Sequence, residues 1–349
     1  MASQHNHDDP QHLVDARGSQ GAQVGHHNKQ QNKFIQTYIE NLFIHAAPGV
    51  ELPVTTTVFD PSLLSASTGI SRRLLAAILE RGIAQTQVAT HNGMHIPQAA
   101  DQLSSLTPVA DRLLETDATP GTRELLLDYW MALTHVHRDA GLAQSSLVSG
   151  QRALAIYRTL ESERARQLAR RTLDTMASAA SKANIPHVPE HYLSLAASLA
   201  NNKGQAARVS LTAASVRAAA GDYAHSAHLI DEETVEAVAG AHSVSLAAAA
   251  LIRRGVSRAL AKGQLTAAAE HDIERAEDML ESALSDGPRL LQRLQLMEGK
   301  ITLMSMRPST LSCLWAERTL VDMVAVGALH GASSKRIAKM RLLVDGMSG

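Results

Sequence analysis

Histidines near the beginning of the chain are the first residues whose types and spacing could support chemistry. His5, His7, His12, His26 and His27 stand among Gln, Asn and Asp residues. Neutral imidazoles bind zinc or nickel, so such a segment could hold a metal ion if a rigid frame oriented the rings. A polar segment without an apolar pattern supplies no such frame. We therefore predict neither a functional metal site nor a cofactor.

Motifs that carry catalysis are missing from the rest of the chain. The triplet His137–Arg138–Asp139 has the letters of a kinase catalytic loop, but it lies in a helical pattern without the other kinase motifs. The sequence has no G-x-x-x-x-G-K-[ST] or G-x-G-x-x-G loop, no H-E-x-x-H and no G-x-S-x-G. Cys313 is the single cysteine, which excludes a disulfide framework, and we expect it to be a buried small residue. These observations predict a protein that is not an enzyme.

Composition indicates packed helices. Of the 349 residues, 45% are apolar but only 3% are aromatic, and alanine and leucine supply much of the apolar share. The net charge of −1 gives no overall electrostatic footprint for nucleic acid. No apolar run is long enough to cross a bilayer, and the first residues lack a signal-peptide core. We expect a soluble, cytoplasmic protein with no membrane partner.

Hydrophobic periodicity divides the chain into three zones. Residues 1–33 have none and are expected to be disordered, residues 34–118 mix helical and β-type patterns, and residues 119–349 are helical almost throughout. The last zone is interrupted at Gly141, Asn184–Pro186, Gly221, Gly263, Gly287–Pro288, Pro308 and Gly331. Interruptions about 40 residues apart predict an α-solenoid of stacked helix pairs.

One helix pair has a more specific pattern than the others. Large residues in its first helix, a turn glycine and small or apolar residues in its second helix follow the order Trp130, Leu133, Gly141, Ala153, Leu154. This order resembles the tetratricopeptide repeat, although Gly150 stands where that repeat has a large residue. The resemblance implies an array with a concave surface for a protein or peptide partner.

The middle zone shows the order of a winged helix-turn-helix. Ser71 could cap a second helix that ends at Gly82, and Asn92-Gly93 between alternating residues predicts a two-stranded hairpin, the wing. A small winged α+β domain followed by a tetratricopeptide array resembles the C-terminal part of bacterial STAND-type signalling proteins.

Two roles stay open for this predicted domain. Ser71, Arg72 and Arg73 would open the recognition helix, where side chains contact phosphates and bases. The wing adds no lysine or arginine, so the same unit could equally serve as a structural or protein-contacting module.

A segment of the polar leader has a composition with no role in folding. Residues 21–34 contain the core Ala22-Gln23-Val24-Gly25, followed by Asn28 and Gln30. The segment resembles a RHIM-type bacterial amyloid signalling motif. Extended copies could stack in register, with ladders of Gln and Asn amides and Val24 in a dry interface. The resemblance implies a homo-oligomer or an effector with a matching motif.

Two functional hypotheses follow from this order of zones. The first is a non-enzymatic adaptor that binds a protein or peptide through its helical array and signals through the leader motif. The alternative is a transcriptional regulator that reads DNA with the winged helix and uses the array to dimerise or to sense a ligand.

Overall fold

The computed structural model of the chain describes residues 72–349, apart from residues 94, 118, 284–289, 331–333 and 348–349. These described residues belong to one compact unit that begins at Arg72. The predicted disordered leader, its motif and the first half of the predicted winged domain lie outside the described residues.

The described part of the chain is built from α-helices, and no strand occurs in it. The helices, in chain order, are α3 (Arg72–Asn92), α4 (Ile96–Ser104), α5 (Thr107–Thr116), α6 (Pro120–Asp139), α7 (Ala143–Tyr157), α8 (Glu163–Lys182), α9 (Val188–Leu199), α10 (Lys203–Ala219), α11 (Tyr223–His228), α12 (Glu232–Ala241), α13 (Val244–Lys262), α14 (Ala267–Ser282), α15 (Leu290–Ser305), α16 (Thr310–His330) and α17 (Ser334–Met347). None of the described helices is long and apolar enough to cross a membrane.

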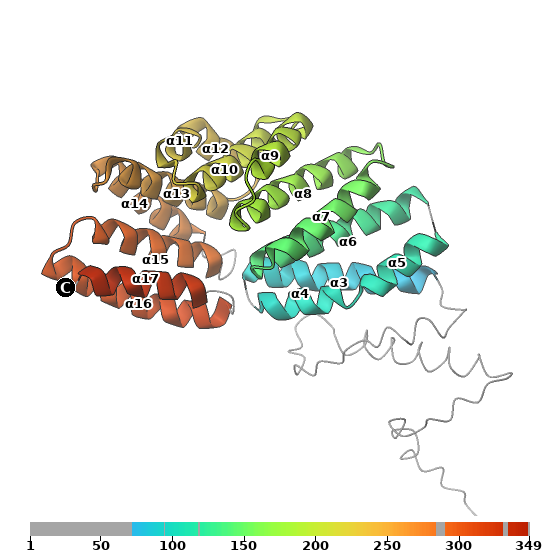
Figure 1. Cartoon of the computed structure of the whole chain (residues 1–349), viewed down its shortest axis with the longest axis horizontal. Helices are drawn as coiled ribbons and strands as arrows, with labels where there is room; N and C mark the ends of the chain where they lie inside the picture. The colour runs from blue at the N-terminus through green and yellow to red at the C-terminus, as the bar shows by residue number, and fades with distance from the viewer. Residues whose placement is uncertain (1–71, 94, 118, 284–289, 331–333, 348–349) are drawn as a thin grey trace, which may run out of the picture. The chain divides into compact units, whose positions relative to one another are not determined.

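Neighbouring helices pack in pairs and follow one another along an arc (Figure 1). The pairs α6–α7, α8–α9, α13–α14 and α15–α16 have extensive contacts, and α8, α10, α13 and α15 connect one pair to the next. This arrangement confirms the predicted array of helix pairs and is consistent with a helical repeat.

Glycines with a left-handed backbone separate the helices of several pairs, as the sequence predicts. Gly141 lies between α6 and α7 at φ 82°, Gly221 precedes α11 at φ 82°, and Gly263 ends α13 at φ 62°. A side chain at such a φ clashes with its own backbone, which is why glycine occupies these turns.

The α6–α7 pair places its signature residues inside the array. Trp130, Leu133 and Ala153 are buried, Leu154 is half-buried, and Gly141 forms the turn. The Ser146 hydroxyl donates a hydrogen bond of 2.8 Å to the Thr134 carbonyl and ties the two helices together.

Gly150, the departure from the repeat pattern in α7, has a packing explanation. A Cβ atom built on Gly150 would lie 2.4 Å from the sulfur of Met176, a fully buried residue of α8. Met176 of α8 therefore fills the volume that a large residue at position 150 of α7 would otherwise occupy.

The predicted wing is wrong, because residues 83–92 continue the helix α3. Leu75, Leu79 and Ile83 are buried four residues apart on one side of α3, so packing carries the helix past its predicted end. Gly82 lies within the helix, where a Cβ atom would come within 2.4 Å of the Leu106 side chain. Gly93, at φ 67°, follows the end of α3 instead of turning a hairpin.

Helices α3, α4 and α5 pack directly on α6 of the first helix pair. The Tyr129 hydroxyl of α6 donates to the Leu103 carbonyl of α4 at 3.0 Å and lies 3.0 Å from the Thr107 hydroxyl of α5. The ring of His137 in α6 lies between the hydroxyls of Ser104 and Ser149, at 3.0 and 3.2 Å.

Candidate functional site

A large groove lies along the inner side of the array. Helices α6, α8, α10, α13, α15 and α17 line it together with α3, whereas α7, α9, α14 and α16 contribute none of its described lining residues. Alternate helices of the pairs thus face the same space, which we call the inner groove. Its volume is about 2220 Å³.

The inner groove is strongly basic, although the whole chain is not. Its described lining residues include three acidic side chains, Asp139, Asp174 and Glu298, and eight basic ones: Arg138, Arg170, Arg171, Lys182, Arg208, Arg253, Arg336 and Lys339. The groove therefore carries five positive charges in excess, in a chain whose net charge is −1.

Four arginines from three helices gather at the α6–α8–α10 end of the groove, and we call Arg138, Arg170, Arg171 and Arg208 the arginine cluster. Two of them have carboxylate partners. Arg138 contacts its neighbour Asp139 at 2.8 Å in α6. In α8, Arg170 donates to Asp174 at 2.8 Å, and both side chains are more than nine-tenths buried.

The other two members of the cluster have no carboxylate within 4 Å among the described residues. Arg208 is half-buried on the groove wall. Arg171 is exposed to solvent and lines the groove. Burial and the neighbouring Arg138 lower the pKa of Arg208 to about 10, and burial together with Arg170 lowers the pKa of Arg171. Both groups remain cationic at neutral pH.

Burial and the arginine cluster also lower the pKa values of two neighbouring groups, His135 and Lys182. Burial, followed by Arg138, Arg171 and Arg208, lowers the pKa of His135 well below its usual range, so this imidazole is neutral at pH 7. Burial and then Arg138 also lower the pKa of Lys182, whose ammonium donates to the Arg138 carbonyl at 3.3 Å.

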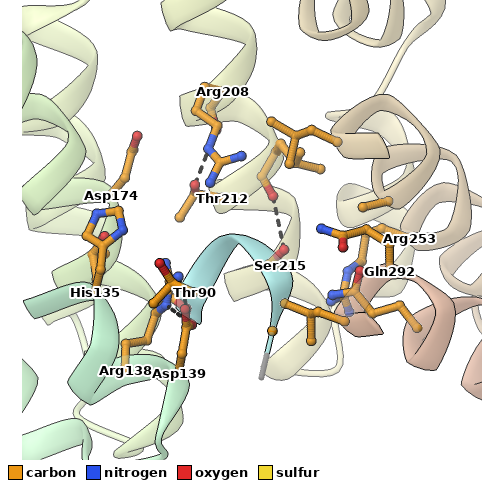
Figure 2. Close-up of a pocket in the computed structure, with 18 of the residues that line it drawn as sticks. Thr90, His135, Arg138, Asp139, Asp174, Arg208, Thr212, Ser215, Arg253 and Gln292 are labelled. Atoms are coloured by element: carbon orange, nitrogen blue, oxygen red, sulfur yellow. Dashed lines mark hydrogen bonds and ion pairs between the residues drawn. The ribbon is translucent and has the colours of Figure 1, made fainter. Parts of the chain in front are cut away.

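The opposite end of the groove is formed by α13, α15 and α17. Glu298 of α15 contacts Arg336 at 3.3 Å and Lys339 at 3.9 Å. Arg253 of α13 has no carboxylate within 4 Å among the described residues, and burial lowers its pKa. Figure 2 shows Arg253 with Gln292 on one side of the groove, facing the side chains that α6, α8 and α10 contribute.

Several buried polar atoms of the groove have no hydrogen-bond partner among the described residues. They are Arg170 Nε, Asp174 Oδ1, His135 Nε2, Gln295 Oε1 and Arg336 Nη1. Buried polar groups in proteins are nearly always hydrogen-bonded, because an unpaired group loses its interaction with water without replacement. A bound polar ligand would supply the missing partners.

The residues that the sequence marks as sites lie elsewhere. Arg72 and Arg73 are exposed in the first turn of α3, where Arg72 lies 3.9 Å from Asp117, and neither lines the groove. Ser71 and the leader motif, Ala22 to Gln30, lie outside the described residues. The residues of the repeat signature support the fold and do not line the groove, except for Gly141 at its edge.

The sites predicted from the sequence include none of the groove arginines, although two arginine doublets in alanine-rich helices mark some of them. Arg170-Arg171 in α8 and Arg253-Arg254 in α13 each place one arginine in a buried ion pair, with Asp174 and Asp272 respectively. The other member of each doublet, Arg171 or Arg253, faces the groove without such a partner.

The groove offers binding groups but no recognisable reaction centre. No group of three or more His, Cys, Asp and Glu side chains in the described part of the chain is placed to hold a metal ion. Arg138 and Asp139 of the kinase-like triplet line the groove as an ion pair, while His137 is buried between two serines. Comparison with known protein families gives no match, and neither does comparison with curated proteins.

Proposed function

We propose that this chain is a non-enzymatic adaptor or regulatory protein whose inner groove binds an acidic segment of a partner protein. The observation that carries the proposal is the excess of five positive charges among the groove residues of a chain with net charge −1. Arginines in a partly desolvated groove attract carboxylates more strongly than arginines on an open surface, because water screens them less.

The size of the groove favours a polypeptide over a small molecule. Pockets for small ligands enclose roughly 300–1,000 Å³, whereas this groove measures about 2220 Å³. Its walls also contain apolar side chains such as Leu211, Ile252 and Val256 and the amides of Gln205 and Gln292. An extended segment with alternating acidic and apolar residues would satisfy both kinds of wall.

Nucleic acid fits the groove less well. Proteins that bind single strands stack bases on aromatic side chains, but Tyr223 is the sole aromatic residue among the described lining residues. The alternative, DNA binding near Arg72 and Arg73, depended on a predicted wing, and the residues of that wing continue helix α3 instead. We therefore do not propose DNA binding.

We also propose that the array is a tetratricopeptide-like repeat and that the leader motif transmits the signal. The buried signature residues of α6–α7 support a tetratricopeptide-like array, as in STAND-type signalling proteins. The leader motif at residues 21–34 would then pass the signal to a motif-matched effector.

The test is the binding of a fluorescent peptide rich in glutamate to the full chain, measured by anisotropy. The wild-type chain should bind this peptide, bind its glutamine counterpart at least about tenfold more weakly, and release the glutamate peptide as salt is added. The double variant Arg208→Ala/Arg253→Ala should lose most of the affinity.

Arg166→Ala is the matched control, because Arg166 is an exposed arginine of α8 that contacts Glu163 at 3.6 Å outside the groove. It should bind the glutamate peptide as the wild type does. Equal affinity for the glutamate and glutamine peptides would contradict the proposal, and so would preferential binding of a single-stranded oligonucleotide.

A further inference from the structure

At the α6–α8–α10 end of the groove, the positive charges outnumber the negative ones by more than one carboxylate of a bound ligand could neutralise. The arginine cluster and Lys182 contribute five positive charges, and Asp139 and Asp174 contribute two negative ones. The excess of three is confined to one end of the groove, and each arginine of the cluster influences the ionisation of His135, Asp174 or both.

The same end contains a buried donor without an acceptor. Arg170 is 3% exposed and uses Nη1 to contact Asp174, but its Nε has no partner among the described residues. Ser178 of α8 also lines the groove, whereas the hydroxyls of Thr175 and Thr212 donate to the carbonyls of Arg171 at 2.9 Å and Arg208 at 3.2 Å. An anion placed here would meet guanidinium donors from three helices, α6, α8 and α10.

We propose that the arginine cluster is a subsite for a phosphoryl dianion, carried as a phosphorylated side chain by the acidic segment. The inference rests on the proposed function and adds the chemistry of one ligand group to it. A phosphoryl group brings a charge of about −1.5 to −2 and three acceptor oxygens, and the planar guanidinium of arginine matches two of these oxygens at once.

A phosphorylated side chain suits the subsite better than a free nucleotide. The sequence has no glycine-rich phosphate loop, and aromatic residues that could stack on a base are limited to Tyr223 among the described lining residues. The groove also continues to Arg253, which would contact acidic residues farther along the same segment.

The experiment compares one acidic peptide in three versions, with phosphoserine, glutamate or serine at its central position, bound to the full chain. The phosphoserine version should bind at least about tenfold more tightly than the glutamate version, since one additional charge-assisted hydrogen bond accounts for such a factor. Inorganic phosphate at millimolar concentration should displace it, and ATP should do so no better than inorganic phosphate.

Variants separate the subsite from the rest of the groove. Arg171→Ala/Arg208→Ala should bind the phosphoserine and glutamate versions with nearly equal affinity. Arg253→Ala should weaken all three versions by a similar factor, and Arg166→Ala should change none of them. Circular dichroism checks that each variant is folded, which we expect because Arg171 and Arg208 are not in the core.

The outcomes distinguish this inference from the proposed function. If no version of the peptide binds, both the proposed function and the phosphoryl subsite are refuted. If the peptide binds but its phosphoserine version binds no more tightly than its glutamate version, the phosphoryl subsite is refuted and the binding of an acidic segment in the groove is supported. If ATP displaces the peptide far better than phosphate does, the site is one for a free nucleotide and the inference is overturned.

Discussion

Asp174 is a carboxylate whose acidity is governed by burial even though arginines surround it. Burial raises its pKa from 3.8 to about 6, and Arg170, Arg208 and Arg138 act in the opposite direction without cancelling that effect. Because the folded chain holds this proton more tightly than the unfolded chain, ionising Asp174 costs stability. Asp174, which contacts Arg170 of the arginine cluster, is thus a carboxylate that takes up a proton at a higher pH than an ordinary aspartate.

The consequence is a specific dependence of stability on pH. As the pH rises through the interval from about 4 to about 6, the contribution of Asp174 to the free energy of unfolding should fall by about 3 kcal/mol and then level off. Asp174→Asn should lack this fall, whereas Asp111→Asn, which removes an exposed carboxylate paired with Arg152, should retain it. Urea unfolding at several pH values measures the difference, and identical pH profiles for Asp174→Asn and the wild type would refute it.

At the scale of the elements, a buried ion-pair network joins α12, α13 and α14. Arg254 is 2% exposed and Asp272 1% exposed, and Arg254 donates to both carboxylate oxygens of Asp272 at 2.6–3.1 Å. Arg254 also donates to Glu232 at 2.7 Å and Arg258 to Asp272 at 2.7 Å. Hydrogen bonds from Arg275 and Arg254 lower the pKa of Glu232 to about 2.

Removing one partner of this network should be far more harmful than removing both. Asp272→Ala should lower the free energy of unfolding by about 3–5 kcal/mol because it leaves Arg254 buried without its main counter-charge. Arg254→Met/Asp272→Leu should recover much of that loss. Glu233→Ala, which breaks the exposed pair with Lys203, should have almost no effect. Similar losses in urea unfolding for Asp272→Ala and Glu233→Ala would contradict this account.

At the scale of the whole molecule, the proposed recognition site and the proposed output segment belong to different parts of the chain. The groove gathers side chains from helices that are far apart in the sequence, so it needs the folded array. The leader motif is a short segment, and its proposed stacking needs only an extended backbone and identical neighbours.

This separation predicts that the leader assembles without the array. A peptide of residues 18–36 should form thioflavin-positive fibres, and Val24→Asp or Gly25→Pro should abolish them, because the first buries a charge in a dry interface and the second removes a backbone donor. Glu or Lys in place of Ser19, outside the motif, is the control and should leave fibre formation intact. A wild-type peptide that stays monomeric at high concentration would rule out the self-assembly proposal.

The error in the predicted winged domain shows where local patterns mislead. Asn92-Gly93 is a strong hairpin signal, and Gly82 is a plausible helix end. Burial of Leu75, Leu79 and Ile83 against other helices outweighs both signals, so Gly82 provides room for Leu106 inside a longer helix. A glycine that ends a helix and a glycine that admits a neighbour look the same in a sequence.

The pairing of helices follows from local sequence signals, because apolar periodicity and turn glycines such as Gly141 act over a few residues, and the same signals indicate the Trp130 position as core. The basic groove, by contrast, arises from packing between helices that are distant in the sequence. Arg171, Arg208 and Arg253 belong to separate helices, and the sequence of each helix does not show that the three side chains share one space. The packing of successive helices turns these three side chains toward the same space, and this long-range arrangement cannot be read from the local pattern of any one helix.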